Sequence, residues 1–137
     1  MKNKYTIGSF NANEIRNKDG WFIGQFMPLR DLEHDTNIEI SVKKLPKGWG
    51  MHDEHPLHYH KVAKEFGIVT NGSARVIFDN KELIIKKGDY YILSQGCEEK
   101  YLEILEDMEL ITIKTPSVSN DKILVDHIFK EKVGVKA

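Results

Sequence analysis

Residues 52–72 read His52-Asp-Glu-His55-Pro-Leu-His58-Tyr-His60-Lys-Val-Ala-Lys-Glu65-Phe-Gly-Ile-Val-Thr-Asn-Gly72 and contain four of the six histidines of the chain. Side chains on a β-strand alternate with a period of two, so His58 and His60 would project from one face of a strand. Glu65 follows closely enough for a tight reversal that would bring its carboxylate near both rings. Two neutral imidazoles and one carboxylate are a donor set typical of iron, manganese or zinc sites.

The residues around His58, His60 and Glu65 distinguish a specific metal site from a histidine-rich tract that binds metal weakly and without function. After Glu65 come an apolar run, the dipeptide Asn71-Gly72 and a second apolar run, which predict a β-hairpin with its turn at Asn71-Gly72. The candidate ligands then fall on or beside strands, and we favour an inward-facing metal site. His52 and His55 precede Pro56, which favours extended or loop backbone before it, so we interpret them as loop histidines at a channel mouth or in solvent.

The spacing His58-x-His60-x4-Glu65-x6-Gly72 resembles the first signature motif of the cupin superfamily, small double-sheet β-barrels whose inward histidines and glutamate hold a metal. Residues 88–99, Gly-Asp-Tyr-Tyr-Ile-Leu-Ser-Gln-Gly-Cys-Glu-Glu, are similar to the second cupin motif. Ser94 stands where proline is usual, and Glu99 stands where the fourth ligand, usually histidine, is expected. The resemblance covers about residues 36–115 and implies an all-β, double-sheet β-barrel or jelly roll with short terminal extensions.

The resemblance implies a metal site made by His58, His60, Glu65 and Glu99, which would hold a divalent first-row metal, namely iron, manganese, zinc or nickel. Two alternatives stay open for Glu99. It ligates the metal as a second carboxylate, or it faces solvent in an acidic run and leaves three protein ligands with open positions for water and substrate.

Length, charge and cysteine usage limit the function classes. A chain of 137 residues predicts a single domain over residues 1–137. A net charge of −1 provides no basic surface for nucleic acid. The single cysteine, Cys97, excludes an internal disulfide, and plain packing is its favoured role. We expect a cytoplasmic protein without a membrane partner, because the amino terminus lacks a signal-peptide core and no apolar run approaches roughly 20 residues.

Several short apolar or alternating segments predict strands, and their spacing favours a sandwich or barrel. They are residues 5–10, 20–27, 37–43, 74–78, 82–86, 90–93 and 108–114. In the third of these we expect Ile38, Ile40 and Val42 to face inward. The segment 21–27 is apolar on both faces, as in a core strand or a subunit interface, and together with exposed sheet edges it predicts a homodimer. Residues 122–137 fit either a helix or a terminal strand.

A metal in a small barrel acts as a Lewis acid or redox centre on a small polar ligand that enters at the mouth, so we expect an isomerase or oxygenase if there is turnover. Residues 113–117 followed by Asp121-Lys122 resemble the end of small stand-alone cupins associated with sugar or surface-polysaccharide metabolism, which favours a sugar or sugar nucleotide as ligand.

Two other functions stay open. One is a metal-free sugar-nucleotide epimerase or ketoisomerase of the cupin type, with His58 or His60 as base and a tyrosine as acid. The tyrosines available for this role are Tyr90, Tyr91 and Tyr101. The other is a module that binds or senses a metabolite without turnover.

Overall fold

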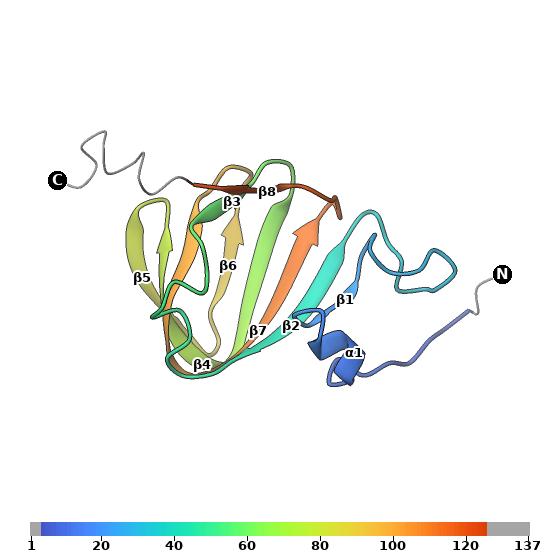
Figure 1. Ribbon diagram of the computed structural model, residues 1–137, viewed down its shortest axis with the longest axis horizontal. Helices are drawn as coiled ribbons and strands as arrows, with labels where there is room; N and C mark the ends of the chain where they lie inside the picture. The colour runs from blue at the N-terminus through green and yellow to red at the C-terminus, as the bar shows by residue number, and fades with distance from the viewer. Residues whose placement is uncertain (1–3, 126–137) are drawn as a thin grey trace.

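The structure is a computed structural model that describes residues 4–125, and Figure 1 shows its strands arranged in curled sheets. One short helix, α1, precedes the first strand. The elements are α1 (Asn13–Arg16), β1 (Trp21–Ile23), β2 (Glu39–Leu45), β3 (His58–His60), β4 (Lys64–Phe78), β5 (Lys81–Lys86), β6 (Tyr90–Leu93), β7 (Glu99–Thr115) and β8 (Lys122–Leu124).

Two long strands, β4 and β7, belong to both layers of the fold. The first half of β4 and the second half of β7 pair with each other, with β6 on one side and with β2 and β1 on the other. The remaining halves pair in a second layer with β5 on one side and with β3 and β8 on the other. All of these pairings are antiparallel, and the predicted all-β double-sheet jelly roll is confirmed.

The hairpin predicted at Asn71-Gly72 is wrong. β4 continues through both residues as one strand, and only its register against β7 shifts there. Gly72 has a φ of +79°, and a Cβ at this position would lie 2.2 Å from the carbonyl oxygen of Asp107. Asn-Gly provides positive φ for a β-bulge as readily as for a turn. Here the bulge lies where β4 passes from one layer to the other.

The alternation of inward and outward side chains predicted for residues 37–43 is correct, but the set of side chains predicted to face inward is wrong. Glu39 and Ser41 are buried, whereas Ile40 and Val42 are only half-buried. By strand register, Ile40 lies opposite Ile113 on the outer face of the layer. The inner face of β2 is polar because it faces a cavity rather than an apolar core.

Both ends of the chain differ from expectation. Residues 5–10 form no strand, and the strand predicted over 20–27 is limited to β1, after which the chain turns at Gly24. The described part of the carboxyl-terminal segment forms β8, which pairs with β3 rather than with the start of the chain. The rest of the tail, from residue 126, lies outside the described residues.

The apolar core lies between the two layers and includes the fully buried side chains of Val69, Val76 and Ile104. Cys97 packs against this core, and burial raises the pKa of its thiol to about 11, as expected of a packing residue. Over residues 4–125, no helix has the length and apolar character needed to cross a membrane.

Candidate metal site

The four predicted ligands lie together inside the fold. His58 and His60 are the two ends of β3, Glu65 is near the start of β4, and Glu99 begins β7. Each is at most 5% exposed. The predicted reversal that would pair the strands of His60 and Glu65 is not formed, because β3 pairs with β7 and β8. Glu65 instead approaches the histidines from the other layer.

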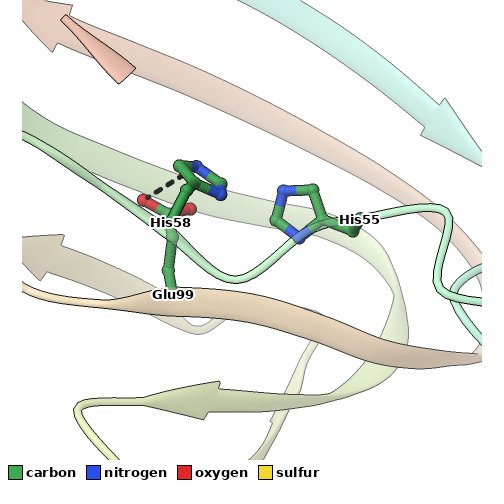
Figure 2. Close-up of side chains that lie close together, drawn as sticks. All are labelled: His55, His58 and Glu99. Atoms are coloured by element: carbon green, nitrogen blue, oxygen red, sulfur yellow. Dashed lines mark ion pairs between the residues drawn. The ribbon is translucent and has the colours of Figure 1, made fainter. Parts of the chain in front are cut away.

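The donor atoms converge closely. Nε2 of His60 lies 3.0 Å from Oε1 of Glu65 and 3.8 Å from Oε2 of Glu99. Nε2 of His58 also lies 3.8 Å from Oε2 of Glu99, the contact drawn as a dashed line in Figure 2. This oxygen of Glu99 is buried and has no hydrogen-bond partner among the described residues. Buried polar atoms are rarely left without a partner, so the arrangement fits a cation between the carboxylates and imidazoles.

A backbone contact orients His58. Its Nδ1 lies 2.8 Å from the carbonyl oxygen of Pro56, which can only accept, so Nδ1 carries the proton. The lone pair is therefore on Nε2, the atom that faces Glu99. Burial lowers the pKa of His58 to about 4, although the hydrogen bond to Pro56 acts in the opposite direction. The ring is neutral near neutral pH, as a metal ligand must be.

Glu65 and Glu99 have opposite pKa shifts. Burial and the neighbouring charge of Glu65 raise the pKa of Glu99 well above its usual range. Burial also opposes ionisation of Glu65, but hydrogen bonds from His60 and Glu99 outweigh it and lower the pKa of Glu65. Without a cation the two carboxyl groups therefore hold one proton between them. A divalent ion would replace that proton, and on this test too the donor set fits a metal.

Asp121 lies next to His60. Its two carboxylate oxygens accept hydrogen bonds from the backbone N–H groups of Val62 and Ala63, at 2.6 and 2.9 Å. Oδ2 lies 4.0 Å from Nδ1 of His60, which has no hydrogen-bond partner in the described part of the chain. Asp121 therefore fixes the turn that follows His60 rather than the imidazole ring itself.

His55 is a site residue that sequence reasoning placed at the mouth or in solvent. Figure 2 shows its ring extending from the loop before β3 toward His58 and Glu99. The ring centroids of His55 and His58 are 5.0 Å apart. The backbone N–H of Tyr101 donates to Nδ1 of His55 at 2.8 Å, and burial lowers the pKa of this histidine to about 3. The neutral ring then carries its proton on Nε2, which makes it a hydrogen-bond donor at the site. His52, in contrast, is exposed.

The site opens into a cavity of about 590 Å³, within the range of small-molecule sites. Trp49 lines it, as do the buried Tyr91 and Tyr101, whose hydroxyl oxygens are 3.0 Å apart. Burial raises the pKa of both tyrosines, so they are neutral groups that can donate but not act as bases near neutral pH. Tyr90, the third tyrosine considered from the sequence, is 75% exposed and lies outside the cavity.

Comparison with known proteins identifies the fold. The family model described as Cupin domain matches residues 49–113, the segment that contains the four candidate ligands and His55. Residues 49–113 form a cupin domain. No curated protein matches the sequence of this cupin.

Solved structures share the fold at low sequence identity. The nucleoside dehydratase Pac13 from Streptomyces is 12% identical, with a TM-score of 0.56 over 66% of this chain and 70% of that one. KdgF from Halomonas is 15% identical, with a TM-score of 0.54 over 64% and 76%. Oxalate decarboxylase from Bacillus subtilis is 19% identical, with a TM-score of 0.54 over 74% of this cupin but only 28% of that longer chain.

Proposed function

We propose that this cupin holds one divalent first-row metal through His58, His60, Glu65 and Glu99 and binds a small polar metabolite, such as a sugar or sugar nucleotide, at that metal. The observation that carries the proposal is Oε2 of Glu99, a buried oxygen that no described residue satisfies and that lies 3.8 Å from Nε2 of both His58 and His60. Iron, manganese, zinc and nickel all suit two imidazoles and two carboxylates.

The residues of the chain perform separate tasks in this proposal. A metal bound there would supply Lewis acidity or redox chemistry to a substrate oxygen. The carbonyl of Pro56 keeps the ring of His58 oriented. His55 donates from Nε2 to the bound metabolite. Tyr91 and Tyr101 share one hydrogen bond, which leaves one of their two hydroxyl groups as a further donor in the cavity wall. The reaction would be an isomerisation or an oxygenation, and we place it in the cytoplasm.

Metal content tests the proposal directly. Elemental analysis of the purified protein, or of protein reconstituted with iron, manganese, zinc or nickel above about pH 7, should give about one ion per chain, because histidine is then neutral. The double variant His58→Ala, His60→Ala should lose the ion, and the exposed His52→Ala should retain it. Substoichiometric metal after reconstitution with all four ions would reject the metal site.

A second candidate is supported by His58 and the buried Tyr101, which line one cavity. The lone pair on Nε2 of His58 and the hydroxyl group of Tyr101 would serve as the base and the acid of a metal-free epimerase or ketoisomerase. Turnover of sugar nucleotides by chelator-treated protein, lost in Tyr101→Phe, would favour this candidate. A ligand that binds wild type and the double histidine variant equally, without turnover, would favour a binding module.

A further inference from the structure

Two of the lysines that line the cavity beside the candidate metal site lie against one aromatic ring. Lys43 comes from β2 and Lys114 from β7, and both line the same cavity as the four candidate ligands. Their ammonium nitrogens lie 4.6 and 4.8 Å from the centroid of one indole ring, that of Trp21. In the strand register Lys114 is directly opposite Glu65. A molecule of metabolite size would therefore reach the metal site and this lysine pair together.

Lys43 forms no ion pair among residues 4–125. Its Nζ donates to the backbone oxygen of Asp19 at 3.0 Å. The pKa of Lys43 is lowered to about 8, chiefly by burial; the charge of Asp19 opposes this shift, and the charge of Lys114 adds to it. Keeping the ammonium group of Lys43 charged in this buried position costs free energy, and a bound anion would offset that cost. The attraction between the ammonium group and the face of Trp21 offsets it only in part.

The neighbouring residues leave room for another acceptor. Nζ of Lys114 lies 3.5 Å from Oε1 of Glu39, while the other oxygen of Glu39 accepts from the hydroxyl of Ser117 at 2.8 Å. Ser41, which lies between Glu39 and Lys43 on the inner face of β2, is fully buried, and its hydroxyl has no partner among the described residues. The inner face of β2 thus presents unsatisfied donors next to the cavity.

The charges around the cavity favour an anionic ligand. Its lining has five basic and four acidic side chains, namely Arg16, Lys43, Lys44, Lys114 and Lys122 against Asp19, Glu54, Glu65 and Glu99. A divalent metal at the site would add to this positive balance. An anionic group on the ligand offsets it, and buried charges that are not balanced are costly.

We infer that Lys43 and Lys114, beside Trp21, form a subsite for a single carboxylate group of the metabolite, whose remaining polar groups face His55 and the metal site. The ligand class is therefore a small carboxylic acid, such as a sugar acid, rather than a neutral sugar, and the titrations below distinguish it from a phosphate ester. The inference rests on the proposed function for the position of the rest of the ligand, but the carboxylate contact itself requires no metal.

Calorimetric titration of the full chain tests the subsite with matched probes. Lactate and glucuronate are the carboxylates, lactamide and glucose are their uncharged analogues, and glucose 6-phosphate is the phosphate ester. Each is titrated into metal-loaded and metal-free protein. The variants are Lys43→Met, the charge-preserving Lys43→Arg and, as a surface control, Lys81→Met at an exposed position of β5. Circular dichroism and metal analysis of each variant show that fold and metal content are unchanged.

The expected result is that at least one carboxylate binds wild type about 10-fold or more tightly than its uncharged analogue, the size of one charge-assisted hydrogen bond. Lys43→Met should abolish this preference, while Lys43→Arg and Lys81→Met should retain it. Equal binding by Lys43→Met, equal binding of charged and uncharged probes, or no binding of either carboxylate would overturn the subsite. Tighter binding of glucose 6-phosphate than of glucuronate would overturn the assignment to a carboxylate.

The same titrations separate this inference from the metal proposal. If the protein holds no metal but the metal-free form prefers carboxylates through Lys43, the metal proposal fails and the subsite stands. If metal binds with full stoichiometry and the carboxylate preference is absent, the subsite fails and the metal proposal stands.

Discussion

The backbone N–H of Tyr101 donates to Nδ1 of His55 at 2.8 Å, and this contact fixes which ring nitrogen carries the proton. A neutral imidazole has one donor and one acceptor nitrogen, so Nε2 of His55 is the donor. His55 lies beside His58 and Glu99 (Figure 2), and the donor atoms of these three residues are close enough to hold a metal on distance alone. The proton on Nε2 instead makes His55 a hydrogen-bond donor.

The first prediction follows from this tautomer. His55→Phe should retain about one metal ion per chain, whereas His58→Phe should lose it, because only His58 presents a lone pair to the site. Binding of a metabolite should weaken by about 10-fold in His55→Phe, the loss of one hydrogen bond in a desolvated site. Elemental analysis and calorimetry measure the two effects. Loss of metal in His55→Phe would show that His55 is a ligand after all.

The second prediction concerns Glu99 and its neighbour Glu98. Glu99 is 3% exposed and faces His58 and His60, whereas the backbone N–H of Glu98 is bonded to Asp79 in the turn before β5. Glu99→Gln should lower metal affinity by about 10- to 100-fold or more, and Glu98→Gln should leave it nearly unchanged. Competition with a chelating dye measures both affinities. Equal affinities would reject the four-ligand site and leave the three-ligand alternative.

The third prediction is a pH dependence of the metal-free protein. The pKa of His55 is about 3 in the folded chain against a reference value of 6.5, so the unfolded chain binds this proton first as the pH falls. Above about pH 6.5, His55 is neutral in both states and has no pH-dependent effect on the free energy of unfolding. As the pH falls from there toward 3, the free energy of unfolding decreases, and at pH 5 it is lower by about 2 kcal/mol. The raised pKa of Glu99 acts in the opposite direction over part of this range.

Urea unfolding of chelator-treated wild type and His55→Phe at about pH 7.5 and 5 measures this effect, since the variant lacks the titrating ring. The difference in the free energy of unfolding between the two pH values should be smaller in His55→Phe. An unchanged difference would mean that His55 is not held neutral by burial.

The fourth prediction is the homodimer, for which the fold provides a different surface from the one expected. The apolar segment at 21–27 contributes Trp21–Ile23 to β1, with Trp21 in the cavity wall. The outer face of the layer that contains β6 is apolar across four neighbouring strands. By register, its side chains are Ile40, Val42, Ile111, Ile113, Phe66, Ile68, Tyr90 and Ile92. A face of this kind is typical of an interface between two identical subunits.

Ile92 is 50% exposed on this face, and Ile84 is 62% exposed on the edge strand β5 of the other layer. We therefore expect wild type to have about twice the mass of one 15.8 kDa chain in analytical ultracentrifugation at micromolar concentration. Ile92→Asp should shift the mass toward that of the monomer, while Ile84→Asp should leave the dimer intact. A monomeric wild type would show that this face is ordinary solvent-exposed surface and not a subunit interface.

The amino-acid sequence alone determined the features that depend on local periodicity. The spacing of His58 and His60 places both rings on one face of any strand, and the structure forms that strand. The turns at Asp79-Asn80 and Gly88 and the end of β7 before Pro116 likewise depend on backbone preferences of a few residues. The resemblance of two motifs to those of cupins was enough to predict the fold and to bring Glu65 and Glu99 to one site.

Only the tertiary structure decided which face of each strand is the inside. Period-two patterns show that a strand alternates, but the inner face of β2 is polar because it lines a cavity, so hydrophobicity selected the wrong side for Ile40. The same long-range pairing makes Asn71-Gly72 a bulge in β4 instead of a turn. It also brings His55 to Tyr101 and Lys43 to Trp21, contacts between residues 46 and 22 positions apart in the sequence, which no local pattern encodes.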